Sequence, residues 1–169
     1  MASQTDPALR ALTLATRTAV AMLGPGDEAH DVAQEVALRV LERRRQLRDP
    51  EKFDAWVHRI AVRETLRAQR KRTHRRRAEA PLDETSEALA AAAIDLDGQL
   101  DAAAFAREAL SRLGERERLV LVLRYVHDLP DSQIAAILDC RRGTVNSLLS
   151  RARDRMRAMP IATQEGGAR

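Results

Sequence analysis

The sequence predicts an all-α protein made of two small helical domains joined by a flexible acidic linker. Aromatic residues make up only 2% of the 169 residues, while alanine, leucine, arginine and glutamate are abundant, and this composition favours helices over sheets. Seven glycines and six prolines interrupt the chain rarely, so long helices are possible. Apolar residues recur at intervals of three and four, which is the period of an amphipathic helix.

The distribution of charge predicts the domain boundaries. Residues 1–77 form the first domain and end in a cluster of lysine and arginine. Residues 78–101 contain aspartate and glutamate but no lysine or arginine, and we expect this alanine-rich stretch to be a linker with at most a transient helix near 86–93. A second helical domain follows over residues 102–158, and residues 159–169 are expected to be a disordered tail.

The first domain is expected to contain three or four helices, with three of them near residues 8–22, 27–45 and 52–72. Gly24-Pro25-Gly26 should end the first helix. Asp27 and Glu28 suit the first turn of the second, because carboxylates interact favourably with a helix N-terminus. The residues expected to face inward are Val32, Val36, Val40 and Leu41 on the second helix and Trp56, Val57, Ile60, Ala61 and Leu66 on the third.

The second domain is expected to begin with helices near 102–113 and 115–127, separated by Gly114. The continuous apolar run 119–123 identifies the second of these as the core of the domain. Residues 130–157 then read as a helix-turn-helix with a polar turn at 139–142. Its inward-facing residues are expected to be Ile134, Ala135, Ile137 and Leu138 before the turn, and Val145, Leu148, Leu149, Ala152 and Met156 after it.

The outer faces of the helix after this turn carry asparagine, serine and arginine. Six arginines lie between Arg141 and Arg157, against a single acid, Asp154. Such a helix fits the major groove of DNA, where asparagine and arginine can bond base edges and hydroxyls can reach phosphates. The charge pattern therefore indicates nucleic-acid binding over an ordinary solvated helical hairpin.

Several function classes are disfavoured. The single cysteine, Cys140, excludes an internal disulfide, and no apolar run approaches the roughly 20 residues of a membrane span. The amino terminus lacks the pattern of a secretory signal, so a cytoplasmic protein without membrane insertion is expected. The four histidines show no metal-ligand spacing, and no phosphate-binding loop or nucleophile motif is present, so we expect no catalytic residues, metal or cofactor.

Two stretches resemble the extracytoplasmic-function sigma factors of bacterial RNA polymerase. Residues 27–35 (Asp-Glu-Ala-His-Asp-Val-Ala-Gln-Glu) and 53–61 (Phe-Asp-Ala-Trp-Val-His-Arg-Ile-Ala) look like sigma region 2. Residues 113–157, which include the helix-turn-helix, look like region 4. Together they cover most of the chain outside the linker and the tail, and their order and separation match the family.

The resemblance implies an alternative sigma factor that binds core RNA polymerase, through the β′ clamp helices and the β subunit, and directs promoter-specific initiation. The family's docking residues fall at Asp31, Gln34, Glu35 and Leu38. The family also implies an anti-sigma factor as a partner, and it implies that the acidic linker threads the positively charged polymerase cleft.

The resemblance likewise implies two contacts with promoter DNA. Region 2 would open the −10 element, with a flipped base bound near the loop at 47–53, and the implied contacts are Lys52, Phe53, Arg59, Arg63, Arg67, Arg70 and Lys71. Region 4 would read the −35 element through Arg141, Arg142, Thr144, Asn146, Ser147, Ser150 and Arg151.

The chain departs from the family at several positions. Asn146 and Leu148 stand where a lysine and an arginine are usual, and Ala37 and Leu41 replace aromatic residues. Two other readings remain: a helix-turn-helix regulator that acts without stable association with polymerase, and a sigma mimic that sequesters an inhibitor. Promoter binding measured with and without core polymerase distinguishes the regulator from a sigma factor, because the regulator should bind alone and a sigma factor should need the core enzyme. Transcription in a reconstituted system distinguishes the sigma mimic from a sigma factor.

Overall fold

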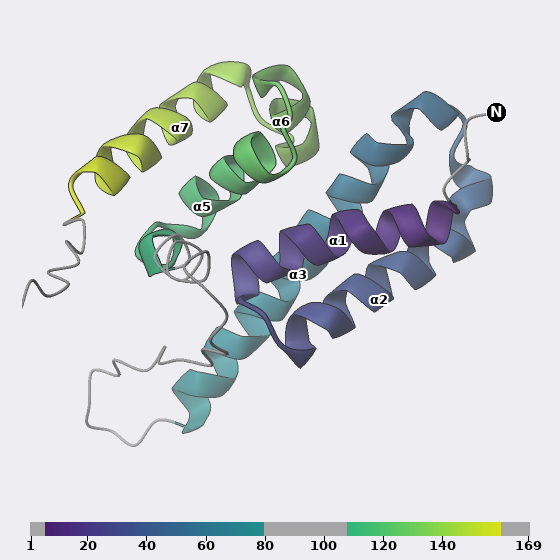
Figure 1. The fold of residues 1–169 in the computed structure, drawn as a ribbon, viewed down its shortest axis with the longest axis horizontal. Helices are drawn as coiled ribbons and strands as arrows, with labels where there is room; N and C mark the ends of the chain where they lie inside the picture. The colour runs from purple at the N-terminus through teal and green to yellow at the C-terminus, as the bar shows by residue number, and fades with distance from the viewer. Residues whose placement is uncertain (1–5, 80–107, 160–169) are drawn as a thin grey trace, which may run out of the picture.

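The computed structural model describes residues 6–79 and 108–159. Every regular element in these two ranges is helical, in agreement with the all-α prediction. We call α1–α3 the N-terminal lobe and α5–α7 the C-terminal lobe; Figure 1 shows the two lobes side by side. The linker between them, most of the helix expected at 102–113 and the C-terminal tail lie outside the described residues, so the predicted domain boundaries stay predictions.

Helices α1 (Pro7–Leu23) and α2 (Asp27–Arg43) form an antiparallel pair joined by a tight elbow. Asp6 caps α1 by accepting a hydrogen bond from the backbone N–H of Ala8 at 2.9 Å. The elbow needs glycine, because Gly24 and Gly26 have φ angles of 89° and 142°, which side chains disfavour. The expected end of the first helix is thereby confirmed.

Helix α3 (Phe53–Glu79) crosses the α1–α2 pair and is longer than predicted. A 3-10 turn, η1 (Arg44–Gln46), follows α2, and a second, η2 (Pro50–Lys52), leads into α3. The predicted end near residue 72 was wrong because the basic run at 75–77 lacks any helix breaker. Arginine has a high helix propensity, so charge alone does not end the helix.

The core of the N-terminal lobe is built from alanine and valine. Ala11, Ala15 and Ala19 on α1 are fully buried, and such short side chains let the neighbouring helices approach closely. Val36 and Val40 on α2 and Val57 on α3 meet this face. Trp56 packs at the margin of the core and is only half-buried.

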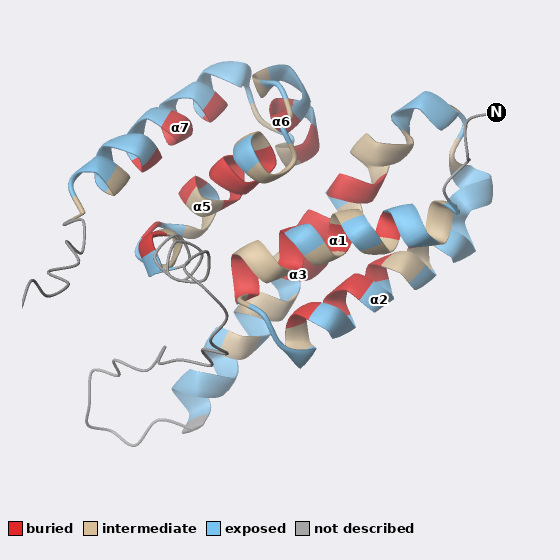
Figure 2. Ribbon diagram, viewed as in Figure 1, coloured by how far each residue is buried: buried red, intermediate tan, exposed pale blue. Residues whose placement is uncertain are grey.

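The C-terminal lobe begins with α5 (Glu115–Leu121), which continues into η3 (Val122–Val126), a π-helix. The sequence predicted one unbroken helix to residue 127, and the wider π turn is the difference. The predicted core role is confirmed, because the apolar side chains at 119–123 are all buried. Figure 2 shows this buried segment beneath α7.

The helix-turn-helix consists of α6 (Asp131–Leu138) and α7 (Arg142–Arg157). Asp139 adopts the left-handed conformation, with φ 51°. The N–H of Cys140 reaches the carbonyl of Ala135 at 3.0 Å, so the turn closes as a Schellman motif. Val145, Leu148, Leu149 and Ala152 face inward as predicted.

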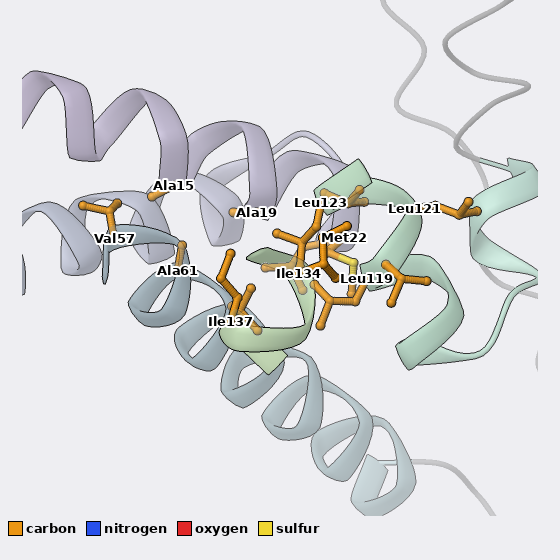
Figure 3. Close-up of a cluster of buried hydrophobic side chains, with 14 of the residues drawn as sticks. Ala15, Ala19, Met22, Val57, Ala61, Leu119, Leu121, Leu123, Ile134 and Ile137 are labelled. Atoms are coloured by element: carbon orange, nitrogen blue, oxygen red, sulfur yellow. The ribbon is translucent and has the colours of Figure 1, made fainter. Parts of the chain in front are cut away.

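The two lobes pack against each other. Helix α6 contacts α3, and η3 contacts α1. Figure 3 shows Met22 of α1 among Leu119, Leu123 and Ile134 of the C-terminal lobe, with Ile137 lying close to Ala61 of α3. Buried residues of both lobes therefore form one continuous apolar cluster.

Candidate nucleic-acid interface and protein-docking face

The outward side of α2 carries the four residues predicted to dock on polymerase. Asp31, Gln34, Glu35 and Leu38 are all exposed, and their spacing of three and four places them on one face. The opposite side of the helix is fixed in the core by Val36 and Val40. The fold thus presents these side chains together on a firmly held helix.

Leu41 belongs to this face and not to the core, so its predicted burial was wrong. Its neighbour Val40 is fully buried, whereas Leu41 is 49% exposed. Leu41 lies three residues after Leu38, which is 56% exposed, so the two leucines form a short apolar strip. The spacing from Leu38 was the signal in the sequence. We call Asp31, Gln34, Glu35, Leu38 and Leu41 the docking face.

An arginine ties the docking face to α3. Arg39 Nε lies 2.7 Å from Glu35 Oε1, and Arg39 Nη1 lies 2.6 Å from Glu64 Oε1. The hydrogen bond to Glu35, aided by the charge of Glu64 and opposed by burial, raises the pKa of Arg39 above its ordinary value. Glu35 is therefore held in place and still exposed at the surface.

The predicted −10 contacts on α3 form an exposed basic stripe. Arg59, Arg63, Arg67, Arg70 and Lys71 are all exposed and recur at helical intervals. Within the described ranges only Arg67 of this set has an acidic partner, Glu64, at 3.9 Å. The stripe is therefore open to phosphate groups.

The predicted base-binding loop before α3 is ordered by its own side chains. Asp49 accepts from the N–H of Glu51 at 3.1 Å, and Lys52 Nζ lies 3.0 Å from Asp49 Oδ2. The hydrogen bond from Lys52, followed by the one from the backbone, lowers the pKa of Asp49. Phe53 starts α3 and packs edge-on against Trp56, with ring centroids 6.2 Å apart. Lys52 is thus exposed but paired, and Phe53 is half-buried.

The predicted −35 contacts share the N-terminal half of α7 and its cap. Figure 2 shows this outer side as exposed, away from the N-terminal lobe. The exposed residues are Arg141, Arg142, Thr144, Asn146, Ser147, Ser150 and Arg151. Ser147 donates to the carbonyl of Gly143 at 2.9 Å, so its hydroxyl proton is engaged within the helix.

The C-terminal half of α7 uses its arginines internally. Arg155 lies 2.7 Å from the buried carboxylate of Glu117, and Arg153 Nε donates to the hydroxyl of Tyr125 at 3.2 Å. These bonds fix α7 on α5 and η3. The two ends of the helix therefore differ in role, and the cationic side chains available for a ligand lie at the start.

Two other properties bear on the site. Over residues 6–79 and 108–159, no three side chains of histidine, cysteine, aspartate or glutamate gather closely enough to hold a metal ion. In the same part of the chain, none of the helices has the length and apolar character needed to span a membrane.

Sequence reasoning missed the contacts between the lobes. Thr18 Oγ1 lies 2.8 Å from His127 Nε2, and Arg118 donates to the carbonyl of Met22 at 3.1 Å. Burial lowers the pKa of Arg118. The partners are about a hundred residues apart, and no local pattern signals such a contact.

Two family models match the chain. The model for Sigma-70 region 2 matches residues 9–75, and the model for Sigma-70 region 4 matches residues 106–156. The matches fall on the N-terminal and C-terminal lobes respectively.

Two proteins of Bacillus subtilis (strain 168) are similar in sequence. The ECF RNA polymerase sigma factor SigW is 31% identical over 144 residues, which cover 80% of this chain and 77% of SigW. The RNA polymerase sigma factor SigV is 32% identical over 131 residues, which cover 78% of this chain and 75% of SigV.

Two solved structures share the fold. The sigma factor RpoE in complex with the anti-sigma factor NepR, from Bartonella quintana, matches with a TM-score of 0.68 and 23% identity, covering 88% of this chain and 91% of that one. CnrH in complex with the cytosolic domain of CnrY matches with a TM-score of 0.61 and 20% identity, covering 90% and 93%.

Proposed function

The chain belongs to the extracytoplasmic-function sigma factors of bacterial RNA polymerase, and we propose that it binds core polymerase through the docking face of α2. The observation that carries this proposal is the pair of exposed leucines, Leu38 and Leu41, beside the fixed carboxylate of Glu35. Apolar side chains next to charges suit a partner helix that bears arginine and apolar residues. The expected partner surface is the clamp-helix region of β′, with further contacts to β.

Promoter opening is proposed to rest on the N-terminal lobe. The stripe Arg59, Arg63, Arg67, Arg70 and Lys71 would follow the phosphate backbone, supplying affinity that falls with salt. Lys52 and Phe53 lie where the ordered loop ends and α3 begins, and an unstacked base would bind there. Preference for single-stranded over duplex DNA drives such opening, so the protein acts by binding and needs no catalytic residue.

Recognition of the −35 element is proposed to rest on the start of α7. Arg141, Arg142, Thr144, Asn146, Ser147, Ser150 and Arg151 would enter the major groove there. Asn146 is placed to read a base edge, and the arginines can contact guanine or phosphate. Promoter recognition takes place at the chromosome, so we propose that the protein is located in the cytoplasm.

An anti-sigma factor is the further partner that we propose. One similar solved structure holds the sigma factor RpoE in complex with the anti-sigma factor NepR, and the other holds CnrH in complex with the cytosolic domain of CnrY. A chain with two DNA-binding lobes can be silenced by one protein that covers both of them.

The test is the affinity of the purified chain for core polymerase. We expect Leu38→Asp and Leu41→Asp each to weaken binding at least tenfold, because a buried apolar contact would become a desolvated charge. Leu9→Asp is the matched control, since Leu9 is also an exposed leucine, at 55%, but lies on α1. Leu9→Asp should bind like the wild type.

Run-off transcription on genomic fragments with core polymerase then reports activity and promoter sequence together. Transcripts that depend on both the chain and Leu38 support the proposal. Failure of the inhibitor-free chain to associate with core polymerase would refute it. Specific promoter binding in the absence of polymerase would favour the independent helix-turn-helix regulator.

A further inference from the structure

The contact between the lobes contains two histidine rings. His58 of α3 is buried, and its ring centroid lies 4.4 Å from that of His127, with the planes at 69°. His127 directly follows η3, so one ring comes from each lobe. The exposed histidines, His30 and His74, lie elsewhere on α2 and α3.

Hydrogen bonding fixes where the proton of neutral His127 resides. The hydroxyl of Thr18 donates to the carbonyl of Leu14 at 3.1 Å. It therefore accepts from Nε2–H of His127 at 2.8 Å. Nδ1 of His127 is then unprotonated, and in the described structure Nδ1 of both rings is buried without a hydrogen-bond partner. A second proton on His127 would create a buried donor with no acceptor.

The surrounding charges also oppose a second proton. Arg17 of α1 lies beside the rings and donates to the carbonyl of Val126. Asp54 of α3 favours a charged His58; its Oδ2 accepts from Arg10 at 2.5 Å, and its Oδ1 is buried without a hydrogen-bond partner in the described structure. On α6 the acidic group is Asp131, which lies 3.8 Å from Arg124.

Burial and the neighbouring charges lower the pKa of His127 more than that of His58. Burial, then His58 and then Arg17 lower the pKa of His127 from 6.5 to about 4. Burial also lowers the pKa of His58, with Asp54 acting in the opposite direction. The packed arrangement thus requires neutral rings at this contact.

Promoter binding, as proposed above, requires the lobes to part. The −10 and −35 elements lie about 25 base pairs apart, or about 85 Å of duplex. Helices α3 (27 residues) and α7 (16 residues) would together span about 65 Å even if laid end to end. Lobes in mutual contact therefore cannot reach both elements.

We propose that His58 and His127 form a proton-sensitive latch, which holds the lobes together while both rings are neutral and releases them when His127 gains a proton. The latch is a property of the free chain. Its link to initiation rests on the proposed function, but its opening can be measured without polymerase or DNA.

The direction of the pH effect follows from the two states. In the open form His127 is solvated and regains its ordinary pKa of 6.5, whereas the closed form lowers it to about 4. The contribution of His127 to the closed form is therefore fully present above pH 6.5, and the ratio of closed to open chains decreases as the pH falls below that value. His127 alone shifts the ratio of closed to open chains about tenfold between pH 7.5 and 5.5, and the effect levels off near pH 4.

The experiment measures the distance between the lobes in the full chain by energy transfer between two dyes. Cys140, in the turn between α6 and α7, is the only cysteine and takes one dye. Glu42→Cys, at an exposed position of α2, takes the other. We expect transfer to fall from pH 7.5 to 5.5 as the open fraction rises, while circular dichroism shows unchanged helix content.

The variants separate the latch from general acid effects. His127→Phe keeps an aromatic ring that cannot gain a proton, so its pH response should shrink to the part that His58 alone supplies. Thr18→Val removes the hydrogen-bond acceptor, and should favour the open form at every pH while keeping the pH response. The control, His74→Gln, alters an exposed histidine on α3 and should respond like the wild type.

An unchanged distance in the wild type between pH 7.5 and 5.5 overturns the latch, and so does an undiminished pH response in His127→Phe. The proposed function fails by a different result, the absence of binding to core polymerase at pH 7.5. The two proposals can therefore fail separately.

Discussion

At the scale of single residues, the most consequential charge in the N-terminal lobe is Glu64. Its side chain is only 8% exposed, and Arg39 reaches it across the α2–α3 boundary at 2.6 Å. A buried carboxylate is costly unless it is paired, so Arg39 is needed for the packing of α3 as well as for the position of Glu35. The pair thus supports the docking face from behind.

Arg39→Ala should lower the free energy of unfolding by about 2–4 kcal/mol, because it leaves the buried Glu64 with only the longer pair to Arg67, at 3.9 Å. Urea denaturation measures the change. The control is Arg112→Ala, which breaks an exposed pair with Glu108 and should cost at most about 0.5 kcal/mol. Equal losses in the two variants would mean that Glu64 is solvated.

Single residues also show where the sequence is ambiguous. Leu41 follows the buried Val40, and either residue could have faced the core on apolar character alone. Adjacent residues of a helix point about 100° apart, so the core contact that buries Val40 leaves Leu41 at the margin of the packed side of α2. Only the spacing of Leu41 from Leu38, a predicted docking residue, favoured exposure of Leu41; the packing of the neighbouring helices then decides which residue is buried.

At the scale of elements, α7 points its two departures from the family sequence in different directions, one toward solvent and the other toward the core. Asn146 is exposed, whereas Leu148 is only 7% exposed and packs inward. A lysine at 146 could reach DNA directly. A cation at 148 would first have to leave the core.

Asn146→Lys should therefore strengthen binding to −35 duplex by polymerase holoenzyme, and should steepen the salt dependence by about 0.9 in log–log slope for one added phosphate contact. Leu148→Arg should instead destabilise the C-terminal lobe by about 2–4 kcal/mol. Filter binding over a salt series and thermal unfolding measure the two effects. Gain of affinity from Leu148→Arg without loss of stability would contradict this assignment.

Elements with strong apolar periodicity were predictable from the sequence. The helices before and after Gly24-Pro25-Gly26 and the two helices of the helix-turn-helix all formed where expected. The end of α3 and the π turn of η3 were not predictable, because the first lacks a breaker and the second depends on packing around it. Of the binding residues, those on α2, α3 and α7 were expected from the family and stand exposed, with Phe53 half-buried.

At the scale of the whole molecule, the lobes share one apolar cluster. Met22 lies among side chains of the C-terminal lobe, and Arg118 bonds its carbonyl. These contacts join residues about a hundred positions apart, so they follow from the complementary shape of two finished lobes. Composition and periodicity describe each lobe separately and could not have predicted the contact.

Met22→Ala should speed amide hydrogen exchange in both lobes, because truncating a shared buried side chain costs about 2–5 kcal/mol. The comparison is Val40→Ala, whose cavity lies within the N-terminal lobe and should affect α1–α3 alone. Exchange followed by mass spectrometry at pH 7.5 resolves the lobes. Faster exchange confined to α1–α3 in both variants would show that the lobes are energetically independent.

The π-helix η3 lets this segment tolerate a change of length. A π turn accommodates one residue more than an α-helix does, and it ends immediately before His127. Deleting one residue from Val122–Val126 would let the turn wind as a regular α turn, so the residues after it would keep nearly their original direction. A deletion in the regular winding of α5 would instead rotate every later residue of the helix by about 100° and turn His127 away from Thr18. Relatives that differ by one residue at η3 can therefore conserve the same junction between the halves of the molecule.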